Sequence, residues 1–118
     1  EQACVETIAA AVSAMDGLDI LVLNAAYQEY RDGFETVSTP EFERVFRTNL
    51  FSMIWLLREA LPHLGRGSSI ISTTSIQASQ PSPGLVDYAM TKAAQVAFTT
   101  ALADELGPQG IRVNAVAP

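Results

Sequence analysis

Cysteine is scarce in this chain, with Cys4 the only one among 118 residues. A single thiol excludes an internal disulfide, and a lone cysteine on a helix is more often a buried, inert side chain than a reactive one. Long apolar runs are also absent, because no stretch of about eighteen apolar residues occurs and no charged leader precedes an apolar segment. The sequence therefore predicts neither a membrane span nor a signal peptide, and we expect a cytoplasmic protein.

Positive charge is the next shortage. Seven Lys and Arg residues stand against thirteen Asp and Glu, which gives a net charge of −6 and an isoelectric point near 4.5. Nucleic acids and anionic membranes require a basic patch, whereas the cations here are scattered. We therefore expect no nucleic-acid partner and no membrane partner. The only histidine, His63, is assigned no chemistry, and no residue is assigned as a metal ligand.

Hydrophobic residues make up 48% of the chain, which is enough to bury the core of one domain or part of one. Three short runs, 19–24, 69–74 and 111–116, predict parallel strands buried on both faces. Helical patterns at 1–16, 39–64 and 86–106 alternate with these strands. This order predicts an α/β fold with helices layered on a parallel sheet.

The helix predicted at 39–64 carries one unusual residue. Its N-terminus is predicted from Thr39 as N-cap, Pro40 at the first helical position and acidic residues in the first turn. Apolar side chains then recur at three-to-four spacing, and only Asn49 interrupts the stripe. A polar group on an apolar stripe needs a partner, so Asn49 is either an amide bonded to the backbone or a functional group.

Ser75, Tyr88 and Lys92 bring a hydroxyl, a phenol and an ammonium to one stretch that runs from a strand end through a loop into a helix. Tyr88 and Lys92 are four residues apart, so their side chains lie on the same helix face. A nearby ammonium stabilises the phenolate that general acid/base chemistry needs. The alternative explanation of the same spacing is a helix face that is simply exposed to solvent. The serine thirteen residues before Tyr88 favours a catalytic site over that alternative.

A serine followed after about a dozen residues by Tyr-x-x-x-Lys resembles the signature of the short-chain dehydrogenase/reductase family. Three further motifs resemble the family in the same order: ILVLNAA at 20–26, TNLFS at 48–52 and GIRVNAVAP at 110–118. The segment 75–92 looks like the glucose/ribitol-dehydrogenase-like subgroup. Where family members usually carry Asn-Asn-Ala-Gly, this chain has Leu23, Asn24, Ala25 and Ala26, so the first Asn and the Gly are replaced.

The resemblance implies a Rossmann-like, doubly wound parallel sheet, present here as its catalytic half only. The three strands would be the fourth, fifth and sixth of the family's sheet. The chain contains no G-x-x-x-G-x-G run after a strand. We therefore expect 1–118 to be a single partial domain that lacks the family's glycine-rich cofactor loop and its substrate loop. The residues that distinguish NAD from NADP would lie upstream of Glu1.

The same resemblance implies an NAD(P)-dependent oxidoreductase that transfers a hydride between a nicotinamide cofactor and a small-molecule alcohol or carbonyl. Its catalytic residues would be Asn49, Ser75, Tyr88 and Lys92, with Asn49 completing a proton path to solvent. The contacts to NAD or NADP would come from Asn24, Ala25, Ala26, Tyr88, Lys92 and Pro118. A non-catalytic nucleotide-binding or oligomer-forming relative is the alternative. The apolar and small residues of helices 39–64 and 86–106, together with the family's four-helix interface, predict a homodimer or homotetramer.

Overall fold

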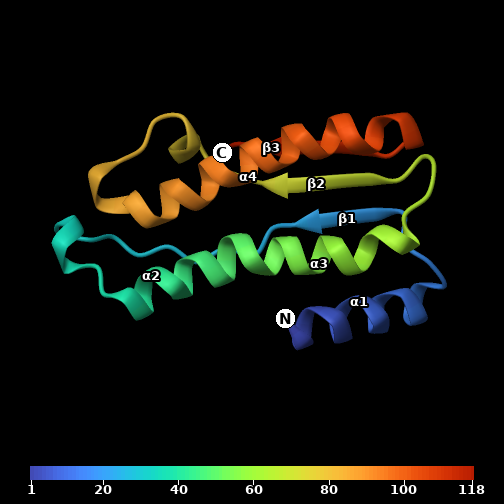
Figure 1. Cartoon of the computed structure of the whole chain (residues 1–118), viewed down its shortest axis with the longest axis horizontal. Coiled ribbons are helices and arrows are strands. Elements are labelled where there is room, and N and C mark those ends of the chain that lie inside the picture. Colours follow the sequence, from blue (N-terminus) through green and yellow to red (C-terminus); the bar gives the residue numbers. More distant parts are fainter.

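The computed structural model describes all 118 residues, and a three-stranded parallel sheet forms its centre (Figure 1). Strand order is β1-β2-β3, and the register pairs Ile20 with Ser69 and Ser69 with Arg112. The elements are α1 (Gln2–Met15), β1 (Ile20–Leu23), α2 (Thr39–Phe46), α3 (Ser52–Ala60), β2 (Ser69–Thr73), α4 (Val86–Leu106) and β3 (Arg112–Val116). The predicted α/β order is confirmed, and each strand lies within one residue of its predicted bounds.

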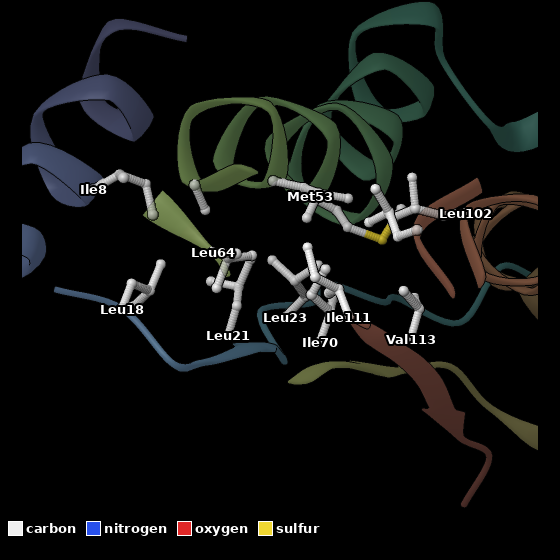
Figure 2. Close-up of a cluster of buried hydrophobic side chains, with 13 residues drawn as sticks. Ile8, Leu18, Leu21, Leu23, Met53, Leu64, Ile70, Leu102, Ile111 and Val113 are labelled. Carbon is white, nitrogen blue, oxygen red and sulfur yellow. The ribbon is translucent and has the colours of Figure 1, made fainter. Parts of the chain in front are cut away.

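All the long helices pack on one face of the sheet. Leu21, Ile70 and Val113 point from the three strands into one apolar cluster (Figure 2). The helices contribute the opposite side of this cluster, with Ile8 from α1, Met53, Leu57 and Ala60 from α3, and Leu102 and Leu106 from α4. Burial of these side chains supplies the main driving force that holds the helices on the sheet.

The other face of the sheet carries no helix. Because side chains alternate along a strand, Ile20 and Val22 point away from the cluster, and they are 62% and 57% exposed. Val116 on β3 is exposed in the same way. The prediction that every strand is buried on both faces is therefore wrong for β1 and β3, which are edge strands with one uncovered face. Only β2, between them, has all its residues buried or half-buried.

The helix predicted at 39–64 is continuous in direction but not uniform. Ser38 caps α2 instead of the predicted Thr39: its hydroxyl accepts from the Glu41 backbone N–H, and the Glu41 side chain accepts from the Ser38 N–H. This reciprocal capping box satisfies two free N–H groups of the first turn. Between α2 and α3 the residues Arg47–Phe51 form a π-helical turn, in which the Ser52 N–H donates to the Arg47 carbonyl five residues earlier.

Helix α4 has the predicted bounds, and its buried side changes character along its length. The first two thirds of the helix bury polar groups, namely Asp87, Thr91, Lys92, Gln95 and Thr99, while the last turns bury Leu102 and Leu106 in the core. Each buried polar group needs a partner. Helix α4 is therefore held to the sheet by apolar packing at one end and by a polar network at the other.

Candidate active site

Lys92 is a residue of α4, and the end of its side chain lies at the carboxyl end of β2. The residue is only 1% exposed. Its Nζ donates to the Thr73 carbonyl at 2.6 Å and to Gln95 Oε1 at 3.2 Å. No Asp or Glu lies within ion-pair distance of it. Burial lowers the pKa of the Lys92 ammonium below its ordinary value, because removing the charge from water disfavours the protonated form. The ammonium is thus held by neutral oxygen atoms without being neutralised.

Tyr88 stands beside Lys92 on the same face of α4, as the four-residue spacing predicts. Lys92 Nζ lies 5.3 Å from the centre of the Tyr88 ring, within the range of a cation–π contact. The Tyr88 backbone N–H donates to Asp87 Oδ1 at 2.8 Å, which fixes the first turn of the helix. The Tyr88 hydroxyl bonds to no other group of the chain, so it is free to bond a ligand.

Ser75 is buried in the segment that follows β2, directly before the 3₁₀ turn Ile76–Ala78 that packs against α4. Its Oγ accepts from the Gln77 N–H at 3.2 Å and lies 3.4 Å from the Pro118 carbonyl. That carbonyl also accepts from the Ile76 N–H. The structure therefore joins Ser75 to Pro118 at the ends of β2 and β3, and it shows no hydrogen bond between Ser75 and Tyr88.

Asn49 is fully buried in the π turn, and its side chain binds the loop after β1. Its Oδ1 accepts from the Tyr27 N–H at 2.7 Å, and its Nδ2 donates to the Tyr27 carbonyl at 2.9 Å and to Thr91 Oγ1 at 3.1 Å. Of the two roles left open by the sequence, the structure displays an amide bonded to backbone. The main-chain carbonyl of Asn49 points to helix α4, where Gln95 Nε2 donates to it at 2.6 Å.

The residues after β1 lie at the same edge of the sheet as Lys92. Asn24, Ala25 and Ala26 are exposed. Asn24 and Ala25 line a small cavity of about 70 Å³ together with Gln95 and Ser52, and Ala26 does not. A hollow of about 400 Å³ lies elsewhere, between the 77–83 loop and α4, and none of Ser75, Tyr88 or Lys92 lines it.

The loop 27–38 folds onto the segment that leads into α4. The Arg31 N–H donates to the Gly84 carbonyl at 2.8 Å, and the Tyr30 ring lies so close to Gly84 that a Cβ there would come within 2.1 Å of it. Arg31 Nη1 bonds Glu41 Oε1 at 2.9 Å. Arg31 is 8% exposed, which makes it a buried charge that joins α2 to the start of α4.

The sequence did not predict two parts of this arrangement, Gln95 and Arg31. Gln95 follows Lys92 by three residues, so the helical spacing that pairs Tyr88 with Lys92 also places Gln95 beside them. Arg31 carried no such signal, because a charged residue in a polar loop is normally exposed. The described residues gather no group of three or more His, Cys, Asp or Glu side chains suited to a metal ion. None of the helices has the length and apolar character needed to cross a bilayer.

Fold and site together define an α/β protein with a polar cluster at the carboxyl edge of a parallel sheet, where such sheets bind ligands. The family model described as enoyl-(acyl carrier protein) reductase matches residues 1–118. A crystal structure of a short-chain dehydrogenase from Burkholderia cenocepacia in complex with NADP superposes with a TM-score of 0.93 at 35% identity, over 98% of this chain and 47% of that one. The chain belongs to the short-chain dehydrogenase/reductase family, as its motifs predicted.

Curated relatives match along the whole sequence. The NADPH-dependent aldehyde reductase 1 of Arabidopsis thaliana is 47% identical over 118 residues, which is 100% of this chain and 41% of that protein. The glucose and ribitol dehydrogenase of Daucus carota is 45% identical over 115 residues, 98% of this chain and 40% of that protein. The chain thus spans about two fifths of the length of the relatives it matches. The subgroup resemblance noted in the sequence is consistent with the carrot protein.

Proposed function

We propose that the protein containing this chain is an oxidoreductase that transfers a hydride between a nicotinamide cofactor and an alcohol or carbonyl compound. The observation that carries this proposal is Lys92, a buried ammonium with no anionic partner, placed beside a tyrosine whose hydroxyl bonds nothing else in the chain. A buried, uncompensated charge is costly and is typical of functional sites.

In this proposal Tyr88 is the general acid/base. It donates its proton to the carbonyl oxygen in reduction and accepts it from the alcohol in oxidation. Lys92 stabilises the phenolate formed in between, because its charge lies 5.3 Å from the ring and is not neutralised by any carboxylate. Ser75 would turn its hydroxyl from the long 3.4 Å contact with Pro118 to the same substrate oxygen.

The residues present fit a nicotinamide cofactor at this edge of the sheet. Lys92 has three N–H donors and the chain uses two of them, which leaves one for a ribose hydroxyl. Asn24, Ala25, Ala26, Tyr88 and Pro118 would make the remaining contacts at that end. When bound, the nicotinamide accepts or gives the hydride. We further propose that 1–118 is part of one Rossmann-like domain whose glycine-rich pyrophosphate loop lies elsewhere in the full-length protein.

For Asn49, both the side chain and the main-chain carbonyl have a place in the proposed site. Its side chain is committed to Tyr27 and Thr91, while its carbonyl reaches the Lys92 network through Gln95. We propose that Asn49 holds the loop after β1 in place and so sets the position of the contacts at residues 24–26. The proton path to solvent would then begin at Tyr88 and Lys92.

Substitution Tyr88→Phe in the full-length protein tests the assignment, because it removes the proton donor and keeps the ring. We expect kcat/KM to fall by roughly 10²- to 10⁴-fold across a panel of alcohols and ketones with NAD and NADP. Tyr30→Phe is the matched control, since Tyr30 is 72% exposed and its hydroxyl has no hydrogen-bond partner in the chain. Near-normal turnover by Tyr88→Phe would exclude the role. Cofactor binding by the wild type without any turnover would instead favour a non-catalytic relative.

We also propose a homodimer or homotetramer formed through helices 39–64 and 86–106. Phe51 on the first helix and Met90 and Val96 on the second are 40–46% exposed, and exposed apolar side chains on both helices favour burial against another copy. A light-scattering mass of one protomer for the full-length protein at micromolar concentration would contradict this assembly.

A further inference from the structure

Gln95 is a buried amide at the centre of the polar network, with 2% exposure. Its Nε2 donates to the Asn49 main-chain carbonyl at 2.6 Å, and its Oε1 accepts from Lys92 Nζ at 3.2 Å. The two partners come from different elements, the π turn Arg47–Phe51 and helix α4. One side chain thus connects the carbonyl of the π turn with the ammonium beside Tyr88.

The geometry of an ammonium group explains what this connection does. Nζ carries three N–H donors in a tetrahedral arrangement. Thr73 fixes one donor from β2 and Gln95 fixes a second from α4, so the direction of the third is determined. With only one acceptor, the end of the Lys92 side chain could pivot about that single N–H···O bond, and the remaining donors would move with it.

The chemistry of the amide matters as much as its position. The titratable group that faces Lys92 from its own helix is Tyr88. The Thr73 carbonyl that bonds it from β2 is neutral, and so is the Asn49 carbonyl of the π turn, which bonds the other end of Gln95. A carboxylate at position 95 would hold Nζ equally well but would neutralise its charge. A neutral acceptor holds the ammonium and leaves its field on Tyr88 intact.

We propose that Gln95 is a positioning residue of the active site, which orients the third donor of Lys92 by bridging it to the Asn49 carbonyl. This inference rests on the proposed oxidoreductase function for its kinetic consequences. Its structural part, the bridge itself, concerns only residues of this chain.

Two substitutions in the full-length protein separate the bridge from simple packing. Gln95→Met keeps the length of the side chain and removes both bonds, while Gln95→Glu keeps an acceptor and adds a negative charge. Gln109→Met, at an exposed position far from Lys92, is the control. The readouts are cofactor affinity by calorimetry with NAD and NADP, the pH profile of kcat/KM, and the titration of Lys92 in protein labelled with ¹³Cε-lysine. Lys92→Arg assigns that signal.

For Gln95→Met we expect cofactor affinity to fall roughly 10-fold or more, as for the loss of a bond to a charged group, and the Lys92 titration to move to lower pH. For Gln95→Glu we expect the Lys92 titration and the kcat/KM profile both to move to higher pH, because a carboxylate favours the protonated ammonium. Either variant that folds tests the bridge.

The inference would be overturned if both variants bound the cofactor with an affinity within twofold of the wild-type value and if neither the Lys92 titration nor the kcat/KM pH profile moved. A fall in thermal stability alone would not rescue it. A wild-type protein that turns nothing over would refute the proposed function. In that case the Lys92 titration alone would still decide whether Gln95 controls the ammonium.

Discussion

Asp87 Oδ2 and Arg31 Nη2 lie 3.6 Å apart inside the protein, at side-chain exposures of 1% and 7%. The distance is within ion-pair range but too long for a hydrogen bond, and neither atom bonds any other group. Asp87 Oδ1, in turn, accepts from the Tyr88 N–H. One carboxylate therefore joins the loop 27–38 to the first turn of the helix that carries Tyr88.

Removing Arg31 should be strongly destabilising, because it leaves the Asp87 carboxylate buried without a counter-charge. We expect Arg31→Met to lower the thermal midpoint of the full-length protein clearly below that of Arg66→Met, which removes an exposed arginine without an ion pair. The double variant Arg31→Met/Asp87→Asn should recover part of the loss. Equal midpoints for the two single variants would show that the buried pair contributes nothing.

Asn49→Ala should detach the loop after β1. It removes three hydrogen bonds and leaves the N–H and carbonyl of Tyr27 without partners. At about 1 kcal/mol for each lost bond, the free energy of unfolding should fall by roughly 3 kcal/mol, measured by chemical denaturation. Asn114→Ala, at an exposed position on the uncovered face of β3, is the control and should change it by less than about 0.5 kcal/mol.

Lys92 should make stability depend on pH in the alkaline range. Its folded-state pKa is lowered by burial, so the unfolded chain binds more protons between that lowered pKa and 10.5. The free energy of unfolding contributed by Lys92 should therefore increase as the pH rises through this window. Lys92→Met should remove that increase in denaturation curves taken from neutral pH upwards. A wild-type slope that survives in the variant would mean that other groups cause it.

The capping box of α2 offers a test at acidic pH. Ser38→Ala should cost about 1 kcal/mol of stability near neutral pH, whereas Ser13→Ala on the exposed side of α1 should not. The pKa of Glu41 is lowered, chiefly because its side chain accepts from the Ser38 hydroxyl and backbone. The contribution of the box should therefore be present above the ordinary pKa of a glutamate and disappear as the pH falls through the lowered value. A Ser38→Ala cost that does not change with pH would contradict this.

Much of the fold could be predicted because local patterns determined it. Short apolar runs gave the strands, and Val86 to Leu106 had clear limits in Gly84 before it and Gly107 after it. The π turn could not be predicted, since the apolar spacing continues through it. The prediction that β1 and β3 are buried on both faces was wrong, because a run of apolar residues shows only that a strand is suited to burial. Whether each face is covered depends on the elements that pack against it.

The candidate site was likewise predicted only where local sequence patterns determined it. The spacing of Tyr88 and Lys92 fixed their common face, and the strand order fixed Ser75, Asn24 and Pro118 at one edge. The sequence did not predict the hydrogen-bond partner of Asn49, because that partner is the main chain of a loop and every residue type has the same main-chain groups. Arg31 was missed for a similar reason: its burial depends on Glu41 and Asp87, which lie 10 and 56 residues further along the chain.

The π turn also changes how the helix between β1 and β2 can evolve. A π turn holds one residue more than a regular α turn, and its five-residue hydrogen bond accommodates that residue within the turn. The extra residue therefore changes the turn that carries Asn49 and leaves α2 and α3 running in one direction on either side of it. Deleting one residue from 47–51 would restore a regular helix and displace Asn49, whose side chain holds the Tyr27 backbone. Insertions and deletions should be tolerated less in these five residues than in the exposed stretch 32–36.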